Sequence, residues 1–274
     1  MVLLQNVVMY TADDKRIVQF LSAAMPAAGL LAVWSARAVF SSNVTIGQVS
    51  RRNAVSWSPK AFGGQKGRSP LIGAMWVLIF SSQFLFSATI LYNTLVQNEF
   101  TTDVSSLFNQ CALTAAALLV ASVWEPVFLI ERPWSFVLAS VLLTTTASMA
   151  TIAAVVADPF LQDNWYLVFG GVSATIFSGW TIVAAGLSVG IVTRVYNRGV
   201  GTREVDVDDT TSLWPLVLAI VTAVLSIAFS NPIFCVPLLA TLFFVQGVAT
   251  SWRIWAAVGV CVVGIVSGVL IVVL

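Results

Sequence analysis

The chain has 274 residues, of which 58% are hydrophobic and only 9% are charged. An ordinary soluble domain carries about 25% charged residues, so a soluble fold could not cover this much apolar surface. The formal net charge of +1 leaves no basic surface for nucleic acid, and we expect no nucleic-acid partner. The composition predicts an all-α, polytopic transmembrane helix bundle that is in contact with membrane lipids.

Eight apolar segments follow one another along the chain, each close to the 20 or so residues that a helical span needs. They cover residues 17–40, 71–95, 107–130, 135–157, 166–193, 213–230, 233–249 and 254–274. Residues 1–16 form an N-terminal segment that does not span. We expect a five-helix bundle over 17–196, a charged loop over 197–212 and three additional helices over 213–274. If the chain only bends at Asn231-Pro232, the count of spans falls to seven.

The basic residues alternate with these spans in a way that places most of them on one face. This face receives Arg37, Arg51, Arg52, Lys60, Lys66, Arg68, Arg132, Arg194, Arg198, Arg203 and Arg253. The opposite face receives only Lys15 and Arg16. Because Lys and Arg collect in cytoplasmic loops, the basic loops should lie on the cytoplasmic-equivalent side. The membrane is either a bacterial inner membrane or an organellar one, mitochondrial or plastid.

Several kinds of chemistry have no residues to carry them. The chain lacks histidine, the commonest metal ligand, general base and axial haem ligand. Its three cysteines, Cys111, Cys235 and Cys261, are far apart in apolar segments and are interpreted as small buried hydrophobic residues. The sequence contains no P-loop, GxSxG, HExxH or dinucleotide-binding motif. We therefore expect no catalytic activity and no metal site.

Tryptophan is abundant, with ten residues in the chain. Six are expected at the membrane interfaces, where indole rings anchor helices: Trp34, Trp134, Trp165, Trp214, Trp252 and Trp255. Trp180 is different, because it lies near the middle of span 166–193 between Gly179 and Thr181. It can be the wall of a pocket for a flat hydrophobic ligand or a part of the bundle core.

Glu125, in Trp124-Glu125-Pro126, is the one carboxylate that falls inside a predicted span. Intramembrane acids are rare and usually functional. Glu125 also precedes the end of its span by only five residues, so its carboxylate can equally meet water or pair with Arg132. In the long basic loop, Trp57 and Pro59 can form a lid over a cavity or belong to a solvated connector.

Small residues recur at the spacing that allows helices to approach closely in lipid. They are Gly170, Ala174, Ser178, Gly186 and Gly190 in one span, and Gly264 and Gly268 in the last. We expect them to pack helices within the bundle rather than between two copies of the chain.

Three stretches resemble the translocator protein family, the tryptophan-rich sensory proteins (TspO/MBR), in its long eight-span form. Residues 76–80 (WVLIF), with Pro70 upstream, are similar to the family's W-G-x-I-Y. Residues 47–52 (GQVSRR) resemble its G-x-I-S-D-x, and residues 179–184 (GWTIVA) fit its G-W-x-x-V-A. The family's P-F-S before G-W is missing, and 60–69 looks like an insertion. The motifs cover about residues 17–196.

The resemblance implies a five-helix bundle whose cavity accepts porphyrins, sterols or other flat apolar molecules. Its wall residues would be Trp76, Phe80, Trp124 and Trp180. Glu125 and Thr181 are further candidate ligand-binding residues. Some family members degrade porphyrin, but the altered motifs and the missing histidines put that activity in doubt here.

Three functions fit the sequence. The first is binding of a small hydrophobic ligand such as a tetrapyrrole or sterol. The second is a non-catalytic accessory subunit of a respiratory or photosynthetic complex, holding lipids or chlorophyll among other subunits. The third is a transporter, for which Glu125 alone gives little support because transporters usually carry polar residues deep in the membrane.

Overall fold

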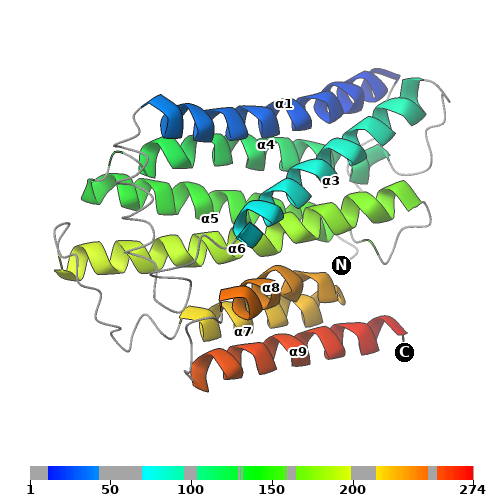
Figure 1. Cartoon of the computed structure of the whole chain (residues 1–274). Helices are drawn as coiled ribbons and strands as arrows, with labels where there is room; N and C mark the ends of the chain where they lie inside the picture. The colour runs from blue at the N-terminus through cyan, green and yellow to red at the C-terminus, as the bar shows by residue number, and fades with distance from the viewer. Residues whose placement is uncertain are drawn as a thin grey trace.

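The computed structural model describes residues 12–42, 70–95, 104–128, 130, 132–157, 159, 165–198, 214–245 and 252–273. These ranges are helical and contain no strand, which confirms the all-α class. The helices, labelled as in Figure 1, are α1 (Ala12–Ser42), α3 (Pro70–Leu95), α4 (Val104–Phe128), α5 (Pro133–Val156), α6 (Trp165–Arg198), α7 (Trp214–Ala228), the 3-10 turn η4 (Pro232–Cys235), α8 (Val236–Val245) and α9 (Trp252–Val273).

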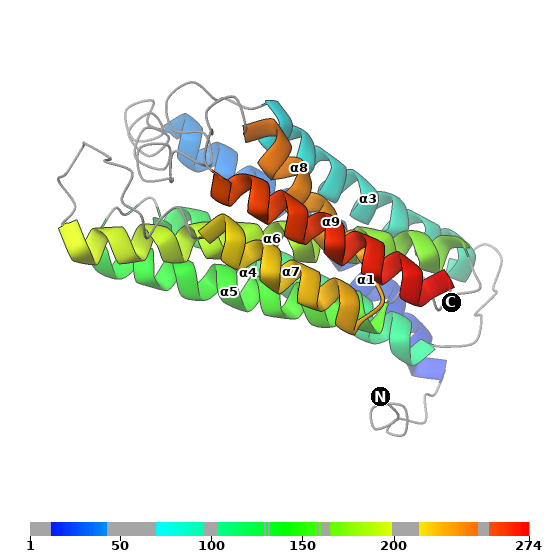
Figure 2. The same ribbon diagram turned by 90° about the horizontal axis from the view of Figure 1, so that it is seen from below.

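Successive helices run in alternating directions along one long axis (Figure 1). Helix α4 packs between α1 and α5, α5 packs on α6, and α3 crosses over α1 and α6. Helices α7 and α9 and the turn η4 form a second group, and α6 contacts α7, η4 and α8 (Figure 2). Helix α6 therefore joins the five-helix group to the C-terminal group.

Within the described ranges, four helices are long and apolar enough to cross a membrane. These spans are Leu107–Phe128, Pro133–Val156, Leu167–Gly190 and Trp255–Val273. Shorter apolar stretches occupy Arg16–Leu31, Val77–Asn93 and Leu216–Ala228. Every predicted segment is thus helical where it is described, and four of the eight meet the requirements for a span. At Asn231-Pro232 the chain reverses, so this region forms two helices and is not one bent helix (Figures 1 and 2).

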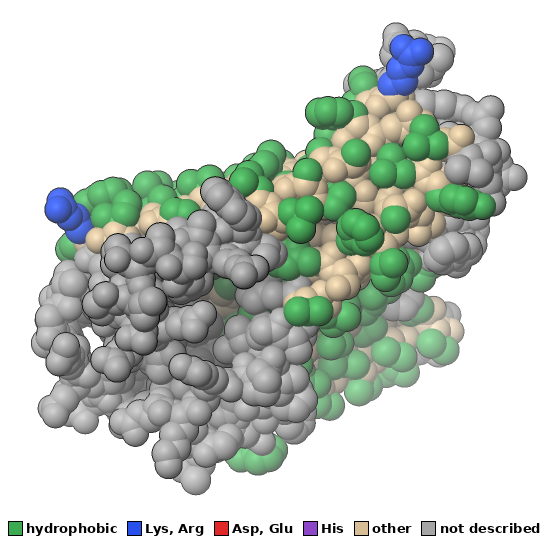
Figure 3. Space-filling view, turned by 45° about the horizontal axis from the view of Figure 1, so that its top comes forward, with side chains coloured by type: hydrophobic (Ala, Val, Ile, Leu, Met, Phe, Trp, Pro, Cys, Tyr) green, Lys and Arg blue, Asp and Glu red, His purple; other side chains and the backbone are tan. Residues whose placement is uncertain are grey.

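Hydrophobic side chains cover the described surface on the face shown in Figure 3, and the Lys and Arg side chains lie at its two ends. Arg16 near the start of α1 and Arg132 before α5 are both exposed. Large apolar residues such as Phe20, Phe84 and Val273 are exposed on the helices. An apolar flank with charged ends suits a helix bundle that is surrounded by lipid.

Helix α1 contains Pro26, which has no N–H and so leaves the carbonyl of Ser22 without its helical donor. Ser87 of α3 donates its hydroxyl to that carbonyl. The hydroxyl of Ser22 lies 3.7 Å from the Sγ atom of Cys111 in α4. In lipid no water can satisfy a freed carbonyl, so this bond both compensates for the proline and joins α1 to α3.

We expect Ser87→Ala to lower the free energy of unfolding by about 1–2 kcal/mol, because the Ser22 carbonyl loses its donor. In a Pro26→Ala background the backbone N–H restored at position 26 can serve this carbonyl, and Ser87→Ala should then cost less. Equilibrium unfolding in mixed detergent micelles measures both costs. An equal cost in the two backgrounds would contradict this account of the proline.

The small residues pack helices of the same chain against one another, as expected. A Cβ atom on Gly170 would lie 2.2 Å from the Phe86 ring of α3, and one on Gly186 would lie 2.5 Å from Leu218 of α7. On α9, Gly264 meets Ala223 of α7 in the same way, at 2.8 Å. These positions therefore serve intramolecular contacts.

Candidate ligand-binding site

A cavity of about 420 Å³ lies between α1 and α3. Its wall consists of Met25, Pro26, Gly29 and Leu30 from α1 and Phe80, Ser81, Gln83, Phe84 and Leu85 from α3. The α1 part of this wall contains Pro26, the proline that leaves the Ser22 carbonyl without a helical donor. The cavity therefore adjoins the point at which α1, α3 and α4 are joined by hydrogen bonds.

The rotation of α3 about its own axis decides which side chains enter this cavity. On one side Ser82 hydrogen bonds to Ser173 of α6 over 2.8 Å, and the Phe86 ring lies against Gly170 of the same helix. Phe80, Gln83 and Ser87 follow at spacings of three and four residues, which places them together on another side of α3. Because Ser87 bonds to α1, this second side faces α1.

Gln83 is the most informative residue in the cavity wall. Its side chain is only 3% exposed. Neither Nε2 nor Oε1 has a hydrogen-bond partner in the part of the chain that the structure describes. A buried amide without partners costs about 1–3 kcal/mol, so such groups are rare unless a ligand or water completes them. Both amide atoms are almost fully covered by protein, so the side chain would have to turn toward the cavity to donate to and accept from a molecule there.

Phe80 supplies the apolar part of the same wall. A Cβ atom on Gly29 would lie 3.1 Å from Cδ1 of the Phe80 ring, so the glycine leaves room for this ring between the helices. No charged residue is among those that line the cavity. The site therefore suits a mainly apolar molecule with one or two neutral hydrogen-bonding groups.

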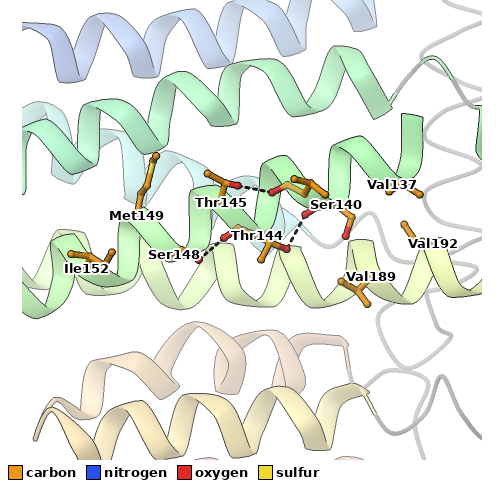
Figure 4. A pocket seen from close by; sticks show the side chains of 10 residues that line it. Val137, Ser140, Thr144, Thr145, Ser148, Met149, Ile152, Val189 and Val192 are labelled. Atoms are coloured by element: carbon orange, nitrogen blue, oxygen red, sulfur yellow. Dashed lines mark hydrogen bonds between the residues drawn. The ribbon is translucent and has the colours of Figure 1, made fainter. Parts of the chain in front are cut away.

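A second space of about 530 Å³ lies along α5 and α6 (Figure 4). It is lined by Val137, Ser140, Val141, Thr144, Thr145, Ser148, Met149 and Ile152 of α5 and by Val189 and Val192 of α6. The hydroxyls of Thr144, Thr145 and Ser148 donate to carbonyls one turn earlier in α5, over 2.8–2.9 Å. These hydroxyl donors are already used within α5, so this second space offers a ligand mainly methyl groups. It would therefore bind a ligand less specifically than the α1–α3 cavity would.

The predicted site residues are distributed over several places. Phe80 lines the α1–α3 cavity. Trp180 is 7% exposed and belongs to a core cluster with Leu118 and Phe177, against which Phe80 also packs. The hydroxyl of Thr181 donates to the carbonyls of Phe177 and Ser178 within α6. Neither Trp180 nor Thr181 is among the residues that line the two spaces.

Trp124 lies in a different cluster from Phe80 and Trp180. Its ring packs edge-on against Phe128, with ring centroids 6.0 Å apart, near the end of α4. The side chains of Trp76 and Glu125 lie outside the described residues, although both positions belong to helices. The predicted lid residues Trp57 and Pro59 also lie outside the described residues.

Two features of the structure were missed by sequence reasoning. Gln83 carried a usable signal, because an amide in the middle of an apolar span is expensive unless it has a partner. Cys235 of η4 and Cys261 of α9 are both buried, as expected, and the fold brings them into the same core cluster. Among the residues that the structure describes, no group of three or more possible metal ligands occurs.

Comparison of the chain with protein-family models, with curated proteins and with solved structures found no match. The α1–α3 cavity is therefore the feature from which a function can be inferred.

Proposed function

We propose that the protein is an integral membrane protein that binds a small, mainly apolar ligand of the tetrapyrrole or sterol kind between α1 and α3. The observation that supports this function is the buried amide of Gln83, which has no partner among the described residues and lies in the wall of a 420 Å³ cavity. A ligand that hydrogen bonds to this amide would remove the cost of burying it. Phe80 would contact the apolar body of the ligand.

We also infer that all eight helical segments are embedded in the membrane, with the basic loops on the cytoplasmic-equivalent side. In this arrangement Arg132 and Arg198 lie on one face, since one begins α5 and the other ends α6. Arg16 at the start of α1 lies on the opposite face. The alternating directions of the helices support this distribution (Figure 1).

The test is a binding titration of the protein in mild detergent with protoporphyrin IX and, separately, with cholesterol. We expect one of these probes to bind, and Gln83→Leu to weaken its binding about fivefold, because one hydrogen bond contributes about 1 kcal/mol. Gly29→Leu should abolish binding by filling the cavity beside Phe80. Thr89→Val is the matched control, since it removes a hydroxyl of α3 that donates to the carbonyl of Leu85 and lines neither space.

The possible outcomes separate the competing functions. Binding that is equally strong in the wild type, Gln83→Leu and Gly29→Leu would place the ligand elsewhere. If neither probe binds and the 29.3 kDa chain purifies only in an assembly many times its own mass, ligand binding is wrong and the accessory-subunit function is favoured. The absorption spectrum of that assembly then shows whether it carries a pigment.

A further inference from the structure

The position of the turn between α7 and α8 along the axes of α6 and α9 is fixed by side-chain contacts. On the α6 side, Asn231 donates its amide Nδ2–H to Oγ1 of Thr175 over 3.0 Å. Thr175 follows Trp165, the first residue of α6, by ten residues, or about 15 Å along the helix. It also follows Gly171, which touches the end of α5 at Ala157, by one helical turn. The turn therefore stops about one helical turn short of the level at which α5 ends, and about 15 Å short of the start of α6.

The contacts with α9 show independently that the turn also stops before the end of that helix. Ser226, just before the turn, donates its hydroxyl to the carbonyl of Gly264 over 2.8 Å. A Cβ atom on Gly268 would lie 3.3 Å from the backbone nitrogen of Pro232. Helix α9 continues for five more residues to Val273, about 7 Å, and all five are exposed and apolar. Both α6 and α9 thus extend past the turn.

The turn is also built like a turn in the interior of a protein. Ser230 has a φ of 51°, and Asn231 is 1% exposed. Oδ1 of Asn231 accepts from the Ile233 N–H over 3.2 Å, and the Asn231 N–H donates to the carbonyl of Ser226 over 2.9 Å. Inside a membrane, irregular backbone is tolerated only where the protein satisfies its polar groups.

We propose that α7, η4 and α8 form a re-entrant hairpin. It enters the membrane from the face where α7 and α9 begin, turns inside the membrane at Asn231-Pro232, and returns to the same face. Helix α9 then crosses the whole membrane beside it. This proposal rests on the membrane integration proposed above, and it is independent of ligand binding.

A re-entrant hairpin and two helices that each cross the membrane both have their outer ends on the same face. Only the depth of the turn in the membrane distinguishes these two topologies. A spin label on Ile227→Cys, in the last turn of α7, reports that depth, because Ile227 is exposed and is not shielded by protein. Val273→Cys at the end of α9 and Val224→Cys within α7 are the comparison positions, both exposed as well. The three native cysteines are buried, so the unsubstituted chain serves as the labelling blank.

The measurement is the collision rate of each label with oxygen, which concentrates in lipid, and with a water-soluble nickel chelate, in reconstituted vesicles. We expect the oxygen-to-nickel ratio at Ile227 to be several-fold higher than at Val273 and close to that at Val224. A ratio at Ile227 equal to or below that at Val273 would overturn the re-entrant hairpin while leaving membrane integration intact. High nickel access at all three positions would instead reject membrane integration, and the hairpin with it.

Discussion

Gly171→Ala is expected to lower the free energy of unfolding by about 3 kcal/mol or more, the largest effect of any single substitution considered for this protein. A Cβ atom at this position would lie 2.1 Å from the carbonyl oxygen of Ala157 and 2.8 Å from the backbone nitrogen of Pro159. Both of these atoms belong to backbone, which cannot rotate away as a flexible side chain can. Relief therefore requires the end of α5 to move away from α6.

The end of α5 is held in place by its own bonds, which is why the clash should be costly. The Ala157 N–H donates to the carbonyl of Ala153 over 3.0 Å, and Ala157 is buried. Helices α5 and α6 are packed along their length, and protein interiors transmit such displacements rather than absorb them. Separation of this pair would also disturb the hydroxyl contact of 2.8 Å between Thr151 and Ser178.

Gly259→Ala provides the matched control, because a Cβ atom at Gly259 would meet no atom within 4 Å. Both glycines lie inside helices, so both substitutions gain the same intrinsic helix propensity, at most about 1 kcal/mol. The difference between the two variants isolates the clash with Ala157. Gly259→Ala should leave the stability unchanged or slightly raised.

Thermal unfolding can be followed with a thiol-reactive fluorogenic dye, because Cys111, Cys235 and Cys261 are free and buried. We expect Gly171→Ala to lower the Tm by roughly 10 °C relative to Gly259→Ala. Equal Tm values for the two variants would show that α5 and α6 do not approach as closely as the structure indicates.

Asn231→Ala is expected to have the second-largest effect, a loss of about 3 kcal/mol. The substitution removes the acceptor of the Ile233 N–H and the donor to Thr175 at once. It leaves the partly buried Ile233 N–H without its acceptor at the start of η4, and an unsatisfied donor of this kind is costly. The turn then loses the bond that attaches it to α6.

A double-mutant cycle with Thr175→Val separates the two roles of Asn231. Thr175→Val alone leaves the Asn231 amide unpaired and should cost about 1–2 kcal/mol. If the two side chains interact as the structure shows, the double variant should cost about 1 kcal/mol less than the sum of the single variants. Thr144→Val, which removes an exposed hydroxyl bonded only to its own helix, should cost less than about 0.5 kcal/mol.

These costs are measured by equilibrium unfolding in mixed detergent micelles. If Asn231→Ala were no more harmful than Thr144→Val, the side chain of Asn231 would not be what holds the turn against α6. A coupling of zero with a large cost for Asn231→Ala would instead assign the whole effect to the capping bond with the Ile233 N–H.

The sequence alone was sufficient to predict the all-helical class and the positions of the helices. Its apolar runs are long, and polar residues with turn character separate them, so each helix is visible in composition without any knowledge of its neighbours. The reversal at Asn231-Pro232 was also predicted, and the structure shows two separate helices on either side of it. Burial of the three cysteines followed from their apolar surroundings, since thiols in such segments behave as small hydrophobic residues.

The tertiary structure alone decided which face of each helix meets which neighbour. A helix that is apolar on all sides carries no periodic pattern to orient it, so its rotation follows from close packing and from a few bonds between distant segments. Ser82 and Ser87 orient α3 through residues that are 91 and 65 positions away in sequence, and this rotation places Gln83 in the cavity wall. The depth of the Asn231 turn depends likewise on Thr175 and Gly264, whose proximity no local pattern records.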